Sequence, residues 1–210
     1  MLYPLKFPKF ISRIFPMLIS RIKTNNKEIF LTFDDGPNTE ITPWVLEILK
    51  KNNAKATFFC TGENSNKNPE ILQQIKTEGH SIGNHTYHHM DGWKTPPSLY
   101  IKEVELAQTA LNKNDIHTRL FRPPYGRISP FLLKKLSKNH QIILWTYLVG
   151  DYSKHLSSQK VVEKLVRKLK PGDIIVLHDS PKSFSNLQYI LPVLIKKLRN
   201  KGYQFKAINQ

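Results

Sequence analysis

The chain has 210 residues, of which 40% are hydrophobic and 23% are charged; these are the proportions of a single globular domain and exclude a largely disordered chain. A formal net charge of +16 would attract nucleic acid, an anionic membrane or an acidic polymer. The basic residues are spread through amphipathic segments, and no zinc-finger spacing, RNP aromatic motif or Gly-rich phosphate loop occurs, so we expect no specific nucleic-acid partner.

The first 27 residues are predicted to form a basic N-terminal arm that precedes a domain of residues 28–210. The longest uncharged run of this arm, between Arg13 and Arg21, is too short to span a bilayer, and no convincing small-residue cleavage site follows it. We therefore expect a cytoplasmic or membrane-associated protein, with export to the cell envelope left open. The arm is compatible with three interpretations: contact with an anionic membrane surface, packing across the bottom of the domain, or a short signal anchor.

After the arm, apolar runs alternate with amphipathic segments. The apolar runs predict strands at residues 28–33, 56–60, 80–83, 119–122, 141–147, 173–178 and 203–207. The amphipathic segments predict helices at residues 42–53, 68–79, 129–139 and 157–172, and Asn68 is expected to cap the second of them. This alternation favours a parallel sheet covered by helices, either an open doubly wound sheet or a closed TIM-like barrel.

Two adjacent carboxylates, Asp34 and Asp35, follow the first strand in the stretch "LTFDDGP". Side chains at neighbouring positions of a strand end point in different directions, so the two carboxylates need not share one role. The alternative is ordinary turn chemistry, in which Asp accepts backbone hydrogen bonds and Gly supplies a positive φ.

Further polar residues follow the other predicted strands. "HTYHH" comes after the third strand, "RPPYG" after the fourth and Asp151 after the fifth, and His178 ends the sixth. Polar residues at the carboxyl ends of successive parallel strands are typical of the active site of an α/β barrel. Helix faces alone would not produce this distribution.

The histidines of "GNHTYHH" suggest a metal site. His85 and His89 could present two imidazoles to one ion, with Asp35 as the third ligand and His88 as a bystander. Two histidines and one carboxylate suit Zn²⁺, Fe²⁺ or Co²⁺, and this assignment leaves Asp34 free to act as a general base. Surface or hydrogen-bonded histidines are the common alternative.

The remaining polar residues allow both a structural and a catalytic interpretation. "FRPPYG" is compatible with a rigid turn, or with an Arg122 that orients Asp34 while a backbone N–H near Tyr125 faces an oxyanion. His178 is compatible with a structural strand-end histidine, or with an acid that protonates a leaving amine while Asp151 holds its tautomer.

These residues resemble the motifs of a known family, the NodB-type polysaccharide deacetylases of carbohydrate esterase family four. The resemblance covers roughly residues 28–207, with five motifs in the family's order. "TFDDGP" is similar to the first motif, which implies Asp34 as catalytic base and Asp35 as metal ligand. "HTYHH" is similar to the second, which implies His85 and His89 as the other two ligands.

The later motifs extend the resemblance. "RPPYG" is similar to the third and implies Arg122 as the partner of the base, with Tyr125 as a backbone donor to the oxyanion. "LHD" is similar to the fifth and implies His178 as the catalytic acid, beside an apolar pocket for the acetyl methyl group that Val176 would line. In the fourth motif Asp151 keeps the second acidic position, but two neighbouring positions depart from the family. These are Leu148, where the family often has Asp, and Tyr152, where it often has Trp.

The resemblance implies a distorted, partly open TIM-like barrel of the (β/α)7 type in one domain. It implies a metal-dependent hydrolase that removes N-acetyl groups from a glycan such as peptidoglycan or a chitooligosaccharide and releases acetate. The expected cofactor is a divalent metal, with Zn²⁺ first and Co²⁺ or another ion as the alternative. Two other functions are compatible with the sequence: a metal-dependent amidohydrolase on a small non-glycan amide, and a catalytically inactive basic module that binds glycan or membrane.

Overall fold

The curled sheet of the computed structural model is organised around β3 (Glu28–Asp34), which pairs in parallel with β4 (Ala56–Cys60) and with β9 (Ile174–His178). Beyond β4 the sheet continues through β5 (Ser81–Asn84), β6 (Leu120–Phe121) and β7 (Gln141–Ile143), and beyond β9 it continues through β8 (Tyr147–Leu148). The structure describes residues 5–209, apart from the side chains of Lys9, Ser12 and Arg13.

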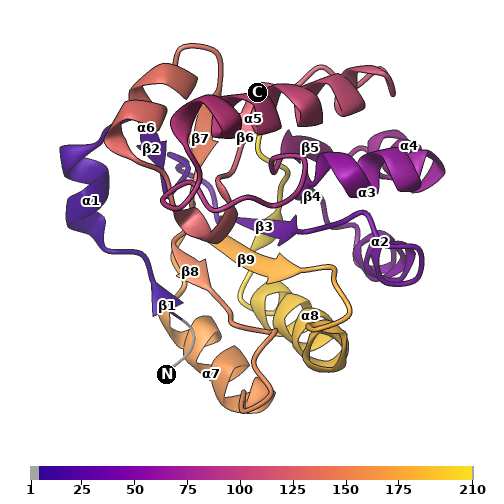
Figure 1. Cartoon of the computed structure of the whole chain (residues 1–210). Coiled ribbons are helices and arrows are strands. Elements are labelled where there is room, and N and C mark those ends of the chain that lie inside the picture. Colours follow the sequence, from indigo (N-terminus) through magenta and orange to yellow (C-terminus); the bar gives the residue numbers. More distant parts are fainter. Residues whose placement is uncertain (1–4, 210) are drawn as a thin grey trace.

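Helices cover the outside of this sheet (Figure 1). They are α2 (Ile41–Lys51), α3 (Gly62–Lys67), α4 (Pro69–Thr77), α5 (Pro97–Asn112), α6 (Pro130–Leu136), α7 (Ser158–Lys168) and α8 (Phe184–Arg199). The result is the α/β, partly open TIM-like barrel that the family resemblance implies.

The two-residue alternation of β3 decides which of its side chains face the helices. Ile29, Leu31 and Phe33 belong to the large apolar cluster that also contains residues of α2, α7 and α8. Phe30 belongs to a different cluster, with residues of β4, β6, β7 and β9, and therefore faces the inside of the barrel. Asp34 is in phase with Phe30, so the strand directs its carboxylate toward the interior at the carboxyl end.

Residues 5–27, part of the predicted arm, lie along the open side of the barrel (Figure 1). They form β1 (Leu5–Lys6), α1 (Lys9–Ile14) and β2 (Leu18–Ile19). β1 pairs antiparallel with β8, and β2 pairs in parallel with β7, so each arm strand covers one edge of the sheet. The division at residue 27 stays a prediction.

Several predicted elements differ in detail. The run 141–147 is interrupted around Trp145 and forms β7 and β8 as separate strands. The predicted seventh strand contributes only β10 (Gln204–Phe205), which pairs with the start of β3 and lies off the main path of the sheet. Asn68 stands at the N-cap of α4 without a capping bond; its side chain donates to the carbonyls of Pro37 and Asn64 instead.

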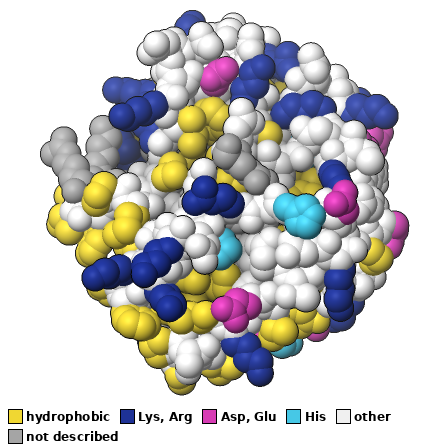
Figure 2. All heavy atoms as spheres, turned by 90° about the horizontal axis from the view of Figure 1, so that it is seen from above, with side chains coloured by type: hydrophobic (Ala, Val, Ile, Leu, Met, Phe, Trp, Pro, Cys, Tyr) yellow, Lys and Arg dark blue, Asp and Glu magenta, His cyan; other side chains and the backbone are white. Residues whose placement is uncertain are grey.

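The excess of basic side chains is not gathered in one place on the face that Figure 2 shows, where Lys and Arg are scattered with a few acidic groups between them. Over residues 5–209, we find no helix with the length and apolar character that a membrane crossing would need.

Candidate active site

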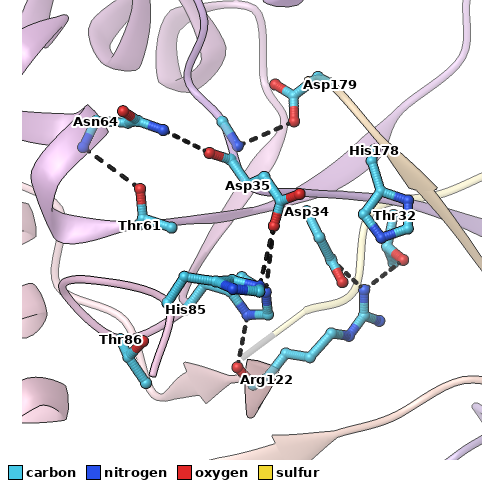
Figure 3. A network of polar contacts seen from close by, with 12 residues as sticks. Thr32, Asp34, Asp35, Thr61, Asn64, His85, Thr86, Arg122, His178 and Asp179 are labelled. Carbon is cyan, nitrogen blue, oxygen red and sulfur yellow. Dashed lines mark hydrogen bonds and ion pairs between the residues drawn. The ribbon is translucent and has the colours of Figure 1, made fainter. Parts of the chain in front are cut away.

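The adjacent carboxylates at the end of β3 face different partners (Figure 3). Asp34 Oδ1 accepts a hydrogen bond of 2.6 Å from Arg122 Nη1. Asp35 Oδ1 instead lies 3.2 Å from His89 Nε2 and 3.8 Å from His85 Nε2. Asp35 can turn away from Asp34 because its backbone adopts a left-handed conformation, with a φ of 81°.

Arg122 is a fully buried cation beneath Asp34. Nη1 also donates to Thr32 Oγ1, while Nε and Nη2 donate to the carbonyls of Ile143 and Leu144. The guanidinium carbon lies 4.1 Å from the centre of the Phe59 ring. Burial lowers the pKa of Arg122, and the neighbouring Asp34 carboxylate opposes that effect. Because these contacts fix the guanidinium, they also fix the carboxylate that it binds.

Asp35, His85 and His89 place one ligand atom each within 4.8 Å of one another. His85 Nδ1 lies 2.7 Å from the carbonyl oxygen of Arg122, which can only accept, so Nδ1 carries the proton and Nε2 presents its lone pair to Asp35. Burial lowers the pKa of His85 to about 4, which keeps the imidazole neutral near pH 7.

This group fits a divalent cation on its own chemistry. Asp35 Oδ1 is buried and accepts no well-aligned hydrogen bond from the described residues, although His89 Nε2 lies 3.2 Å from it. Burial would raise the pKa of Asp35, but His89, His178 and His85 hold it below its ordinary value. One carboxylate oxygen and two imidazole nitrogens therefore converge, and Nε2 of His85 carries no proton where it faces Asp35. Zn²⁺ and related ions prefer such a ligand set.

His178 stands opposite this group, at the end of β9. The register of β3 and β9 makes His178 the partner of Asp34, so the two side chains lie at one level of the sheet. Asp151, which is fully buried, accepts one hydrogen bond from the backbone N–H of His178 and one from its Nδ1, both 2.8 Å long. This leaves Nε2 of His178 as the ring atom that can exchange a proton with a ligand.

Left-handed backbone conformations gather at the site. Among the non-glycine residues with a positive φ are Asp35, Thr86, His89 and Tyr125. Such conformations cost of order 1 kcal/mol or more each and persist where the surrounding structure enforces them. At Tyr125 this conformation accompanies a ring that is exposed and lies 4.7 Å from the His89 ring, edge to face.

A cavity of about 910 Å³ opens at this end of the barrel, a size suited to a ligand of several rings. Seven of the predicted site residues line it: Asp34, Asp35, His85, His89, Tyr125, Val176 and His178. The other two, Arg122 and Asp151, lie buried directly behind and bind Asp34 and His178. The structure therefore brings all nine predicted residues together.

His88, the expected bystander, points to a different partner. Its Nδ1 lies 3.0 Å from Glu103 Oε1, and its backbone N–H donates to Glu103 Oε2. This pair ties the histidine segment to α5.

One buried carboxylate at the site was not predicted. Asp179 accepts a hydrogen bond from the backbone N–H of Gly36 at 3.1 Å and one from the hydroxyl of Thr42. A side chain at position 36 would collide with Asp179, so this close approach needs glycine. Asn64 Nδ2 donates to the carbonyl of Asp35 at 2.7 Å and holds the same turn from the other side. The position of Asp179 directly after His178 was the available signal.

Residues 21–142 match the family model described as polysaccharide deacetylase. The chain belongs to the polysaccharide deacetylase family. A peptidoglycan-N-acetylglucosamine deacetylase of Bacillus cereus is 37% identical over 187 residues, covering 88% of this chain and 68% of that protein. PdaA, a peptidoglycan-N-acetylmuramic acid deacetylase of Bacillus subtilis, is 31% identical over 193 residues, covering 89% of this chain and 72% of that protein.

The structure of this polysaccharide deacetylase is similar to solved ones as well. The crystal structure of the Bc1960 peptidoglycan N-acetylglucosamine deacetylase superimposes with a TM-score of 0.86 at 34% identity, covering 94% of each chain. Family, fold and relatives together confirm the expected enzyme class, a hydrolase of amide carbon–nitrogen bonds in glycans.

Proposed function

We propose that this polysaccharide deacetylase hydrolyses the acetamide of N-acetylated sugars in peptidoglycan, with a divalent metal held by Asp35, His85 and His89. The observation that carries the proposal is the divergence of the two carboxylates at the end of β3, where Asp35 faces two imidazoles and Asp34 faces Arg122. The names of the similar proteins support peptidoglycan over other glycans. We propose Zn²⁺ first, because the ligand set suits it; bound there, it would polarise the acetyl carbonyl and favour ionisation of water.

In this proposal Asp34 is the general base. It takes a proton from the water that attacks the acetyl carbon, and Arg122 keeps its carboxylate charged and oriented for that transfer. Three further hydrogen bonds hold the Arg122 guanidinium in place. The Asp34 carboxylate that it binds is therefore already oriented before substrate arrives.

His178 is the general acid in this proposal. Its protonated Nε2 gives a proton to the sugar nitrogen as the carbon–nitrogen bond breaks, so acetate and a free amino sugar leave. Asp151 holds the ring through Nδ1 and stabilises the protonated form. The base and the acid stand on neighbouring strands as register partners.

Two residues are assigned to the acetyl group itself. The backbone N–H of Tyr125 donates a hydrogen bond to the oxygen that becomes negative in the transition state. Val176 lies in register with Thr32 on the neighbouring strand and lines the cavity, and we assign to it the contact with the acetyl methyl group.

The departures from the fourth motif give the cavity an apolar wall. Leu148 is the pairing partner of Leu5 of the arm, and both line the cavity. The Tyr152 ring lies 5.1 Å from the His178 ring, edge to face. An aspartate is thus replaced by an apolar contact, so we expect this wall to contact an uncharged part of the sugar.

The test combines metal analysis with acetate release from a panel of peptidoglycan fragments, chitooligosaccharides and small N-acetyl compounds. We expect one bound divalent ion per chain and the highest kcat/KM on a peptidoglycan fragment. Turnover of small amides alone would favour the amidohydrolase alternative, and binding without turnover of any member would favour the inactive module.

A further inference from the structure

An aromatic surface lies beside the proposed catalytic site and extends beyond the predicted motifs. Trp93 is 67% exposed and Tyr125 is 60% exposed, which makes them two of the most exposed large aromatic side chains of the described residues. Tyr125 lines the cavity, and its ring contacts that of His89. Arg127, which also lines the cavity, has its guanidinium carbon 5.6 Å from the centre of the Tyr125 ring and 5.3 Å from that of Trp93. The surface therefore runs outward from His89 through Tyr125 and Arg127 to Trp93.

The Trp93 ring is held in place although it faces solvent. Its Nε1 donates to the carbonyl of Ile128 at 3.3 Å, and its backbone N–H donates to Asp91 Oδ1 at 3.0 Å. Gly92 forms a β-bridge with Ile128, and a side chain at position 92 would collide with the carbonyl of Arg127. Arg127 Nη1 donates a hydrogen bond of 2.5 Å to Asp91 Oδ2, and the two side chains form an ion pair. These contacts tie the segment Asp91–Trp93 to the segment Arg127–Ile128.

This arrangement differs from an ordinary exposed aromatic residue. Single exposed apolar side chains are common and need no explanation. Here, however, the ring is anchored through Nε1 and the backbone of the same residue through its N–H. The ring also lies near a cation and continues a line of side chains that begins at a proposed metal ligand. An exposed indole face contributes little to the stability of the fold. An indole ring that is already held in one orientation, however, offers a ligand a large contact area at low entropic cost.

We propose that Trp93 and Arg127 form a binding subsite for a second sugar of the glycan, next to the sugar whose acetamide enters the catalytic site. The apolar face of that pyranose ring stacks on the indole of Trp93. Arg127 has N–H groups beyond the one that binds Asp91, and these bind oxygens of the sugar or of a carboxylate that it carries. The inference rests on the proposed function, and it adds that the enzyme recognises a chain of at least two sugars.

The experiment compares substrates of increasing length in matched variants. Trp93→Ala and, as a control, Tyr189→Ala are assayed on N-acetylglucosamine, its tetramer and a peptidoglycan tetrasaccharide. Tyr189 is also exposed but stands on α8 and does not line the cavity. In Trp93→Ala we expect kcat/KM to fall roughly tenfold on the longer substrates, mainly through KM, and to change less than about twofold on the monosaccharide. Trp93→Phe should recover part of the loss, and Tyr189→Ala should behave as the unsubstituted enzyme.

A binding measurement supplies a readout without turnover. The deacetylated tetramer should change the tryptophan fluorescence of the unsubstituted protein, and this change should be smaller in Trp93→Phe, where only Trp145 of the cavity lining can still report binding. An equal loss on short and long substrates in Trp93→Ala, or no loss on either, would overturn the subsite. If the unsubstituted protein releases acetate from no glycan, the proposed function fails instead. In that case the binding measurement still tests the subsite, and tetramer binding that does not depend on Trp93 would overturn it.

Discussion

Asp151 binds His178 at two points, through the backbone N–H and through Nδ1 of the ring. Burial by itself lowers the pKa of His178, but the Asp151 carboxylate, with smaller effects of Asp35 and Asp34, raises it to about 9. His178 is therefore protonated across the neutral range, as a general acid must be. This relationship sets the direction of the pH dependence of the enzyme.

The first prediction concerns Asp151→Asn. Because a raised pKa keeps His178 protonated up to about pH 9, activity should fall along an alkaline limb near that pH. Without the carboxylate the burial effect dominates, so the limb should move to pH 6.5 or lower. A shift from about 9 to about 6.5 reduces the protonated fraction at pH 8 roughly 30-fold, which kcat measured from pH 5 to 10 would detect.

Glu103→Gln is the matched control for this prediction, because it removes the carboxylate from another histidine–carboxylate pair, His88 and Glu103. Its alkaline limb should stay in place. An Asp151→Asn variant with an unchanged limb would show that another group is the acid.

The second prediction separates metal binding from proton transfer. Asp35→Asn and His89→Ala should lose both the bound metal and activity, because each removes one of the three converging ligand atoms. Asp34→Asn should keep a full complement of metal and lose turnover about 100-fold or more, the range expected for a general base. Metal content by mass spectrometry and acetate release are measured on the same samples. Loss of metal from Asp34→Asn would contradict the assigned division of roles.

The proximity of these residues could be predicted from the sequence because parallel strands end at one edge of a sheet. That rule places Asp34, Asp35, His85, Arg122 and His178 close together without knowledge of any contact. The residues that hydrogen-bond around this site from the helices could not be predicted by the same rule. Thr42 and Asn64 bind Asp179 and the Asp35 carbonyl from helices whose packing only the folded chain defines.

Other features gave weak local signals. The run 141–147 is apolar throughout, and nothing in its composition indicates the interruption at Trp145 that separates β7 from β8. β1 and β2 have two residues each and exist because they pair with β8 and β7, which are distant in the sequence. α5 was not predicted; its buried stripe contains a charged residue, Glu103, which binds His88.

The third prediction concerns the stability of the buried pair. Arg122→Met would leave Asp34 buried without its cation and would remove the donors to the carbonyls of Ile143 and Leu144. Removing one partner of such a pair costs about 3–5 kcal/mol of unfolding free energy. Arg119→Met is the control, since exposed Arg119 makes one bond to the Asn139 carbonyl, and it should cost less than about 1 kcal/mol. Urea unfolding compares the two, and equal costs would refute the structural role of Arg122.

The last prediction concerns the proposal that the N-terminal arm contacts an anionic membrane. Phe10 and Ile14 are exposed on α1, four residues apart and therefore on one helical face, and Met17 is exposed in the turn that follows. Removing residues 1–27 would not test this proposal cleanly, because it would also remove β1 and β2 from the edges of the sheet. A variant with serine at the three exposed positions keeps both strands.

The chain should sediment with vesicles of phosphatidylcholine and phosphatidylglycerol at low salt and less so at high salt, because its excess positive charge is screened. Phe10→Ser/Ile14→Ser/Met17→Ser should weaken this binding roughly tenfold or more, since apolar side chains supply the inserted surface. Phe131→Ser, which removes an equally exposed aromatic ring from α6, should bind as the unsubstituted chain does. Equal binding by the triple variant and the unsubstituted chain would leave α1 without a membrane role, and the arm would then serve only to cover the two edges of the sheet.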